Sequence, residues 1–387
     1  MTHESSLRLK IAILSRGFNS RAGGAENYSI SLVEELAARH DVHVFTQHLD
    51  HQYPGVTYHV IPQCVKKPSW IDLLCFSVRT WMATRKEFDL VHSHENTWHG
   101  QIQTVHVRPV KVGLFYGRTG IRRLVRYLQI ATSLRLWTYL LMERNRFNPS
   151  RGKAVIACSD SLRIELERAY PVLQGKVYLL PPGVRPAKIC NASEKAELRK
   201  DLQLNGDAFL LLFVANDYAK KGLAPLLLAL QGLPSNITLL VVGNSVHIPE
   251  YSQFAQKLNI SHRVRFIGSV NAVERYYQVA DVHVHPTTED TFSMVTLEAL
   301  AHGLPVIVSG PAFCGISSSL TDQVEVLMLK DPRDATEIGT CILRLLGDEK
   351  LRVKLSIAGK KFAKNYGWSE LARQQESIYL DALKAKR

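Results

Sequence analysis

The feature that most constrains the fold is the alternation of short, mostly apolar segments with longer helical patterns. The apolar segments are KIAILS (10–15), DVHVFT (41–46), FDLVHS (88–93), AVIAC (154–158), VYLLP (177–181), FLLLFVA (209–215), ITLLVVG (237–243), RVRFIG (263–268), DVHVHP (281–286) and PVIVS (305–309). Apolar strands separated by helices predict parallel sheets that are covered on both faces.

These strands are too many for one comfortable open sheet. The Pro-Pro-Gly at 181–183 and the polar stretch 185–197 divide the chain near its middle. We therefore predict two doubly wound, Rossmann-like α/β domains that face each other across a cleft, over residues 1–184 and 185–366. The last helix, within residues 367–387, is expected to pack back on the first domain. Ligands of such sheets bind outside the carboxyl ends of the strands.

Composition narrows the class of protein. The 387 residues include no run of 18 apolar residues, and the start MTHESSLRLKIAILS lacks a signal-peptide pattern. We expect a mature chain that begins near Met1 and stays in the cytoplasm. The six cysteines form no Cys-x-x-Cys pair and are expected to be reduced thiols.

The net charge of +13 suggests a polyanionic partner. Residues 108–153 hold eleven Lys or Arg and one acid, Glu143, and so carry most of this charge. From Ile121 onward they read as a basic amphipathic helix with aromatic residues, which suits an anionic membrane surface. A helix packed in the first domain with a solvated basic face is the alternative. Nucleic-acid binding is not expected, because no recognition motif accompanies the charge.

Two carboxylates in the segment 286–306 are placed unusually. Asp290 resembles the N-cap of a helix from about Thr291 to His302, and Glu298 lies inside its apolar stripe. Eight helical residues span about 12 Å, so the two carboxylates can hold two ends of an elongated ligand rather than one atom. The helix start at Thr291, Phe292 and Ser293 would suit a negative group between them. Glu298 is costly there unless hydroxyl donors, or a structural partner, pair with it.

Two further turns could face phosphates. Gly23 and Gly24 precede a helix, where a backbone can approach an anion closely. Lys220 and Lys221 follow the first strand of the second domain. A tight turn and a solvated lysine pair are equally good readings of each feature alone.

Histidines crowd the loops of the first domain at His92, His94, His99 and His106. No Cys/His spacing signature accompanies them, so no metal site is expected. His94, Glu95 and His99 either line the acceptor side of the cleft or are ordinary loop residues.

The chain resembles the GT-B glycosyltransferases of glycosyltransferase family 4 over nearly its whole length. The resemblance is carried by GGAE (23–26), PPGV (181–184), AKKGL (219–223) and ADVHVHPTTEDTFSMVTLEALAHGLPVIVS (280–309). The last contains the family's carboxylate–seven residues–Glu signature. Within the family, NDYAKKG, LLPPGV and FCGI (313–316) resemble the lipopolysaccharide core heptose glucosyltransferases.

The resemblance implies a role for each matching residue. Glu298 would bind the ribose hydroxyls of the donor, and Asp290 would lie by the donor sugar. Lys221 would neutralise the leaving diphosphate, the Gly24 amide would face the donor phosphates, and His106 would lie near the reacting sugar.

The chain departs from the family pattern at two positions. Asp290 stands where the family has Glu, although Glu289 is adjacent, and Asn216 stands where the family has Arg, a charge that Lys220 could replace.

The implied function is a retaining, metal-independent transfer of a hexose. UDP-glucose would be the donor, and a membrane-associated glycan such as the lipopolysaccharide core would be the acceptor. We expect no cofactor, a monomer, and a peripheral location on the cytoplasmic face of the inner membrane. The alternatives are a GT-B sugar-nucleotide epimerase and a non-catalytic relative that binds membranes or polyanions.

Overall fold

The computed structural model describes residues 8–19, 23–116, 118–150 and 152–386. The expected start near Met1, and residues 117 and 151 of the basic segment, lie outside these ranges. The chain divides into two compact units. Unit 1 comprises residues 1–182 and 368–387, and unit 2 comprises residues 183–367. The observed division after residue 182 falls two residues before the expected one.

Unit 1 is built on a parallel seven-stranded sheet with the order β5-β3-β1-β6-β7-β8-β9. Its strands are β1 (Lys10–Leu14), β3 (Asp41–Thr46), β5 (Val56–Val60), β6 (Leu90–Ser93), β7 (Ile102–Val105), β8 (Ala154–Ala157) and β9 (Val177–Leu179). A separate short pair joins β2 (Gly17–Phe18) to β4 (His48–Leu49).

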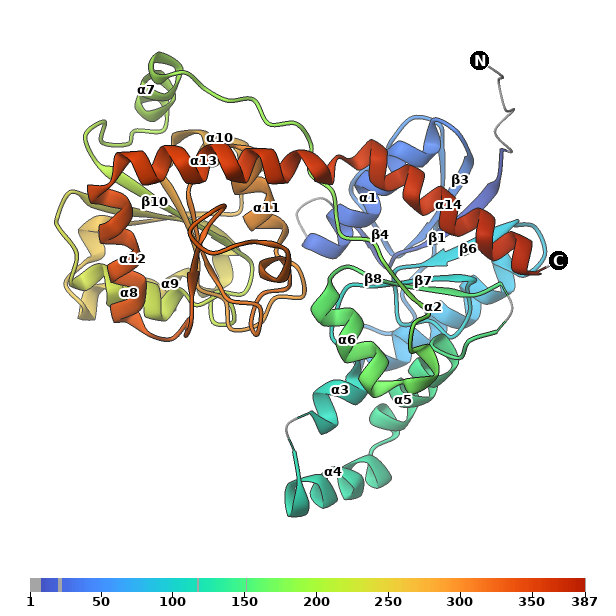
Figure 1. The fold of residues 1–387 in the computed structure, drawn as a ribbon. Helices are drawn as coiled ribbons and strands as arrows, with labels where there is room; N and C mark the ends of the chain where they lie inside the picture. Colours follow the sequence, from blue (N-terminus) through green and yellow to red (C-terminus); the bar gives the residue numbers. More distant parts are fainter. Residues whose placement is uncertain (1–7, 20–22, 117, 151, 387) are drawn as a thin grey trace. The chain divides into compact units, whose positions relative to one another are not determined.

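Helices cover the sheet of unit 1, except that α4 (Gly120–Thr132) projects away from it, and the last helix comes from the far end of the chain (Figure 1). They are α1 (Gly24–Ala37), α2 (Ser69–Thr84), α3 (Val110–Phe115), α4 (Gly120–Thr132), α5 (Leu134–Arg146), α6 (Asp160–Ala169), the 3-10 turn η1 (Pro171–Leu173) and α14 (Trp368–Lys386). Helix α14 lies along α1, where Glu376 accepts from Arg39 Nε at 2.6 Å.

Unit 2 has a parallel six-stranded sheet with the order β12-β11-β10-β13-β14-β15. Its strands are β10 (Phe209–Ala215), β11 (Ile237–Gly243), β12 (Val264–Gly268), β13 (Val282–His285), β14 (Val306–Ser309) and β15 (Leu327–Leu329). Its helices are α7 (Ala192–Asp201), α8 (Leu223–Gln231), α9 (Ile248–Lys257), α10 (Glu274–Val279), α11 (Met294–Ala301), α12 (Ala335–Gly347) and α13 (Glu349–Ala363). Its 3-10 turns are η2 (Ser245–His247), η3 (Ser261–Arg263), η4 (Gly315–Ser319) and η5 (Lys364–Tyr366).

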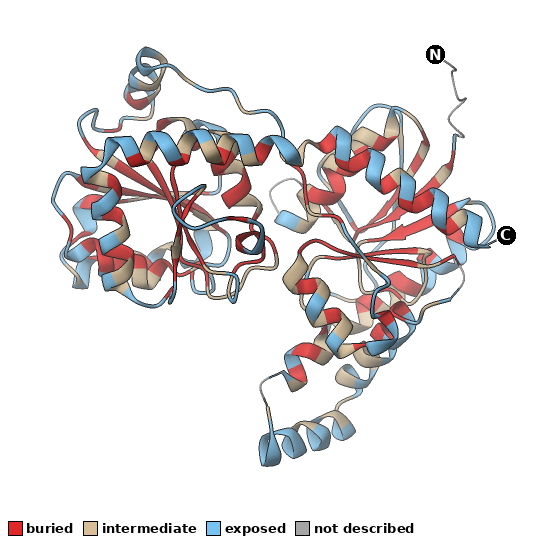
Figure 2. Ribbon diagram, viewed as in Figure 1, coloured by how far each residue is buried: buried red, intermediate tan, exposed pale blue. Residues whose placement is uncertain are grey.

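Buried residues follow the strands of both sheets and the inner faces of the helices (Figure 2). Leu211, Phe213, Leu239 and Val241 on neighbouring strands of unit 2 are fully buried. Because helices cover both faces, successive residues of a strand are buried rather than alternating with polar ones. This burial explains why continuous apolar runs identified most strands.

The same criterion missed β5, β7 and β15, as well as the β2–β4 pair. Strand β7 is polar in sequence but buried, because Arg146 donates to Gln103 Oε1 at 2.9 Å and to the Thr104 carbonyl at 2.7 Å. A buried polar strand is tolerated when its groups are hydrogen-bonded in this way. Strands β5 and β15 are sheet edges, where apolar runs are short or interrupted.

Each sheet has a point at which the chain reverses its direction of winding. In unit 2 this point lies between β10 and β13, which are neighbours although β11 and β12 intervene in sequence. In unit 1 it lies between β1 and β6. The loops that follow these strands diverge there and leave room for a ligand.

In unit 2 the two loops at the reversal approach each other at Gly222. This glycine has φ of 81°, and a Cβ added to it would lie 2.0 Å from the Pro286 carbonyl oxygen. Only a residue without a side chain fits, so the β10 loop and the β13 loop touch through their backbones.

Gly222→Ala should therefore separate the two loops. The left-handed backbone alone costs about 1–2 kcal/mol for an L-residue, and the clash adds to it. We expect a lower melting temperature by calorimetry. Gly206→Ala, at a glycine with open space around it, is the control and should leave the melting temperature unchanged. Equal behaviour of the two variants would contradict the close approach.

Candidate active site

The centre of the candidate site is an ion pair between the two loops at the reversal of unit 2. Lys221 Nζ lies 2.7 Å from Asp290 Oδ2 and donates to the Glu289 carbonyl at 3.1 Å. Lys221 follows β10 and Asp290 follows β13, so the sheet topology brings them together. Both side chains are mostly shielded from solvent, at 22% and 14% exposure.

A buried histidine is hydrogen-bonded to the carboxylate of Asp290. His285, the last residue of β13, has its Nε2 3.0 Å from Asp290 Oδ2 and is fully buried. Burial alone would raise the pKa of Asp290, but His285 and Lys221 outweigh it and hold the pKa well below its ordinary value. Asp290 is therefore ionised at neutral pH, and it holds Lys221 in one place.

Backbone hydrogen bonds fix the loop that carries these groups. The Lys220 carbonyl accepts from the Thr288 amide at 2.8 Å and from the Thr287 hydroxyl at 3.2 Å. Asp290 pairs with the segment before η4, donating to the Phe313 carbonyl and accepting from the Gly315 amide. Its position is thus set by strand-like pairing on one side and by Lys221 on the other.

This pairing overturns the expected helix start. Helix α11 begins at Met294, its N-cap is Ser293, and Asp290 lies outside it. The backbone of Asp290 instead pairs with the segment at Cys314, Asp290 Oδ1 accepts from the Phe292 amide at 3.3 Å, and the Phe292 carbonyl accepts from the Ile316 amide at 2.8 Å. Phe292 is buried, and Ser293 has φ of 83°, a left-handed conformation that marks the sharp entry into the helix. Thr291 lies in the same turn.

Glu298 lies on α11 with one described side-chain partner, the hydroxyl of Tyr277, which donates to Oε2 at 2.9 Å. Burial of the carboxyl raises its pKa to about 7, and the Tyr277 hydrogen bond opposes this rise only in part. The carboxylate retains acceptor capacity for further donors, such as vicinal hydroxyls. Tyr277 is a structural partner for this glutamate, and the binding of ligand hydroxyls by Glu298 stays a prediction.

The remaining donor-side candidates lie around the same loops. Lys220 is exposed beside Lys221, and the Glu289 amide is close to the Thr287 hydroxyl at 3.2 Å. Asn216 lines a cavity of about 260 Å³ at the end of β10, together with Asp217, Ala219, His247, Glu250 and Tyr251. This cavity adjoins the loop that carries Lys221.

In unit 1 the Gly23–Gly24 turn leads directly into α1, which begins at Gly24. The side chain of Glu26 folds back over the turn: its Oε2 is 3.1 Å from where a Cβ on Gly23 would lie. A carboxylate thus occupies the electropositive start of the helix, where an anionic ligand was expected.

His94 and His106 form a stacked pair after β6 and β7. His94 Nδ1 lies 2.8 Å from His106 Nε2, and the Tyr28 ring packs edge-on against His106. Burial, reinforced by the nearby Arg146, lowers the pKa of His106 to about 3. The pair is therefore neutral at pH 7, and each ring donates or accepts according to its tautomer.

Glu95 joins the same end of the sheet, because its Oε1 accepts from the Arg16 amide at 2.9 Å. His99 does not. Its Nε2 lies 3.3 Å from the Thr80 hydroxyl of α2, and Lys153, at the amino end of β8, is close enough to lower its pKa further. His94, Glu95 and His106 therefore gather at the carboxyl ends of the strands, whereas His99 lies toward the opposite end.

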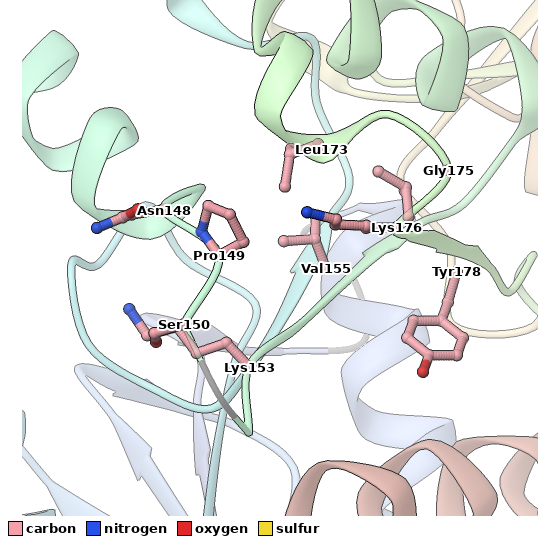
Figure 3. Close-up of a pocket in the computed structure, with 10 residues that line it drawn as sticks. Asn148, Pro149, Ser150, Lys153, Val155, Leu173, Gly175, Lys176 and Tyr178 are labelled. Carbon is pink, nitrogen blue, oxygen red and sulfur yellow. The ribbon is translucent and has the colours of Figure 1, made fainter. Parts of the chain in front are cut away.

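A larger cavity of about 600 Å³ lies away from these groups, at the amino ends of β8 and β9 (Figure 3). Figure 3 shows Asn148, Pro149 and Ser150 on one side of it and Lys176 and Tyr178 on the other. It holds none of the candidate residues. Among the described residues, no three His, Cys, Asp or Glu side chains are grouped so that they could hold a metal ion.

Sequence reasoning missed the residues that support the candidates. His285 and Tyr277 hold the two carboxylates, and Gly222 permits the loop contact. One signal was visible: β13 holds two histidines, His283 and His285, immediately before the carboxylate motif, and a buried imidazole is costly without a polar partner. Tyr277 offered no comparable signal, because its contact with Glu298 depends on packing between α10 and α11.

Family models match both units of this chain. The model described as Glycosyltransferase Family 4 matches residues 22–188, and that described as Glycosyl transferases group 1 matches residues 194–362. The chain belongs to this family of glycosyltransferases.

Two curated relatives match part of the chain. A D-inositol 3-phosphate glycosyltransferase of Xylanimonas cellulosilytica is 28% identical over 60% of this chain and 59% of its own length. The lipopolysaccharide glucosyltransferase WaaG of Escherichia coli is 25% identical over 58% of this chain and 61% of its own length. The chain thus spans about three fifths of the length of these relatives.

Solved structures show the same fold. The crystal structure of WaaG has a TM-score of 0.82 at 20% identity, covering 95% of this chain and 99% of that one. Anabaena Alr3699/HepE in complex with UDP-glucose has a TM-score of 0.76 at 16% identity, covering 96% and 99%. The fold of this family member is GT-B.

Glu298 makes the glycosyltransferase's stability depend on pH. Because its folded pKa of about 7 exceeds the ordinary value of 4.5, its contribution to stability falls as the pH rises between these values. Glu298→Gln should therefore melt at a higher temperature than the wild type above pH 7, and this gain should vanish below about pH 4.5. UDP affinity should fall in the same variant, since charge-assisted hydrogen bonds contribute about 1.5–3 kcal/mol each.

The measurements are melting curves across pH and calorimetric titration with UDP. Glu197→Gln, on the exposed face of α7, is the control. A variant that melts like the wild type at pH 8, or binds UDP equally well, would contradict the assignment of Glu298.

Asp290→Asn tests the ion pair. A depressed pKa means that Asp290 contributes stability above its ordinary value of 3.8 and loses it as the pH falls. The variant should be less stable by roughly 1–3 kcal/mol at pH 7, because Lys221 is left without its anion. Denaturant unfolding measures this loss. Asp201→Asn, which breaks an exposed contact to Arg275, should cost less than about 1 kcal/mol. Equal losses would contradict a special role for Asp290.

Proposed function

We propose that the protein is a retaining glycosyltransferase that moves a hexose from a UDP-sugar, most simply UDP-glucose, to a membrane-associated glycan such as the lipopolysaccharide core. The observation that carries the proposal is the Lys221–Asp290 pair at the reversal of unit 2, followed on α11 by Glu298. Support for the donor comes from HepE, whose structure is a complex with UDP-glucose. Support for the acceptor comes from WaaG, which is involved in lipopolysaccharide biosynthesis.

In this proposal the site works by electrostatics. Breaking the glycosidic bond places negative charge on the diphosphate, and Lys221, with Lys220 beside it, stabilises that charge. Asp290 keeps Lys221 oriented before the donor arrives and accepts a hydroxyl of the donor sugar afterwards. Glu298 accepts from the ribose hydroxyls, which favours its ionised form. The family resemblance assigns to His106, which is neutral and contacts His94, the role of a hydrogen-bonding group for the reacting sugar.

Acceptor-dependent release of UDP is the test of this function. We expect UDP to form from UDP-glucose only when a lipopolysaccharide core acceptor is present, and to form equally in EDTA. Release restored only by Mg²⁺ or Mn²⁺ would contradict the metal-independent mechanism. Conversion of the UDP-sugar without an acceptor would favour an epimerase. Binding without any turnover would favour a non-catalytic relative.

We further propose that α4 docks the protein on the cytoplasmic face of the inner membrane. None of its described residues is buried, and Ile121, Leu124 and Leu128 are 80%, 60% and 62% exposed. Its arginines, Arg122, Arg123 and Arg126, alternate with these apolar residues. The next helix, α5, adds Leu134 and Trp137 at 75% and 57% exposure. No described helix is long and apolar enough to cross a membrane.

The exposure of the apolar residues of α4 supports this proposal. A helix packed on a domain would bury its apolar stripe, but α4 leaves its stripe and its cations in the open. Anionic headgroups would pair with the arginines while the leucines and Tyr127 enter the interface. Each basic side chain near such a surface contributes about 1 kcal/mol.

Sedimentation with anionic vesicles tests the docking surface. We expect binding at low salt, release at high salt, and at least a tenfold loss when Arg118, Arg122, Arg123 and Arg126 are all changed to Glu. A control variant with the same change of charge has four other arginines changed to Glu, namely Arg333, Arg344, Arg352 and Arg373. Salt-insensitive binding, or equal losses in both variants, would contradict docking through α4.

A further inference from the structure

Two of the six cysteines lie against each other on the surface of unit 1, outside the sites described above. The side chain of Cys75, on α2, interacts with that of Cys64, in the loop after β5. Cys64 is exposed and Cys75 is half-buried. Of the other four, Cys158 and Cys314 are buried, and Cys190 and Cys341 are half-buried residues of unit 2.

Two hydrogen bonds hold the loop that carries Cys64 against α2, which carries Cys75. The Cys64 amide donates to Asp72 Oδ1 at 2.9 Å, and Arg79 Nη1 donates to the Pro62 carbonyl at 2.7 Å. Asp72, Cys75 and Arg79 follow one another at three- and four-residue spacing on α2, so they share one face of the helix. The loop is thus held on α2 on both sides of Cys75.

The surroundings favour thiol chemistry. Lys66 and Lys67 lie two and three residues after Cys64 in the loop. The neighbouring Cys64 and burial raise the pKa of Cys75, against the opposing charge of Arg79, so the exposed Cys64 is the thiol that an oxidant meets first and Cys75 is the second thiol. Exposed cysteines in positively charged surroundings, with a second thiol in reach, are the ones that oxidants attack.

We propose that Cys64 and Cys75 form an oxidation site, in which a peroxide converts the thiol pair into a disulfide. The exposed Cys64 thiolate attacks hydrogen peroxide, which breaks the O–O bond and leaves Cys64 as a sulfenic acid with release of hydroxide. The Cys75 sulfur then attacks the Cys64 sulfur and gives up its proton. The S–S bond forms as water leaves, so that two thiols and one peroxide yield one disulfide and two waters. A thiol reductant reverses the reaction.

The disulfide would brace the acceptor side of unit 1. Asp72, which holds the Cys64 amide, also accepts from Arg16 Nη2 at 3.1 Å, and the Arg16 amide donates to Glu95. Asp72 therefore connects Cys64 to Arg16, whose amide contacts Glu95 at the end of β1. A covalent link would add to the two hydrogen bonds that hold the loop on α2.

Peptide mapping of the full-length protein tests the proposal directly. The reduced protein is treated with hydrogen peroxide, blocked with N-ethylmaleimide and digested with trypsin. Cleavage after Lys66 separates the two cysteines, so a disulfide joins two peptides and lowers their summed mass by two hydrogen atoms. We expect this joined pair in the wild type and in Cys341→Ser, and its loss in Cys64→Ser and in Cys75→Ser.

A second readout separates the two chemical steps. In Cys75→Ser, the sulfenic acid on Cys64 has no resolving thiol and should be trapped by dimedone several-fold more than in the wild type. Hydrogen exchange at the Cys64 amide should slow on oxidation. The proposal fails if both cysteines stay free, if each is over-oxidised without a link, or if the link forms to another cysteine. Unchanged exchange would refute the bracing.

Discussion

The geometry of the candidate donor site depends on one backbone contact, the approach of Gly222 to the Pro286 carbonyl. A side chain at residue 222 would hold the two loops apart, and Lys221 could not reach Asp290. The contact also lets the Lys220 carbonyl accept from Thr287 and Thr288. The parallel sheet brings the two loops to the same edge, and the absence of a side chain at Gly222 lets their backbones come into contact.

The charges of this site are balanced before any ligand arrives. Lys221 is neutralised by Asp290, and Asp290 is held by His285 from within the sheet. Glu298, raised to a pKa of about 7 by burial, is close to half protonated at neutral pH. Burying these groups costs desolvation energy that the protein offsets only in part. A ligand with a diphosphate and vicinal hydroxyls would complete the pairing, which gives the site a physical reason to select one.

The candidate histidines of unit 1 are neutral, unlike the ion pair of unit 2. His94 and His106 are kept neutral by burial near the buried guanidinium of Arg146, which itself satisfies the polar strand β7. That region is a buried, hydrogen-bonded network. Helix α4 is the opposite case, since its apolar residues and arginines contribute nothing to the core of the unit. Its exposed apolar residues and arginines are the basis of the docking surface proposed above.

The sequence by itself determined the two-domain α/β plan, because continuous apolar runs are the direct consequence of sheets buried on both faces. It also singled out Glu298, because a carboxylate within an apolar helix is costly without partners, and the family resemblance singled out Lys221 and Asp290; their roles stay predictions. It misplaced the start of α11, because local capping preferences for Asp290 lost to pairing with residues 313–316. His285, Tyr277 and Gly222 became visible only in the tertiary structure, which alone decides the neighbours of residues far apart in the chain.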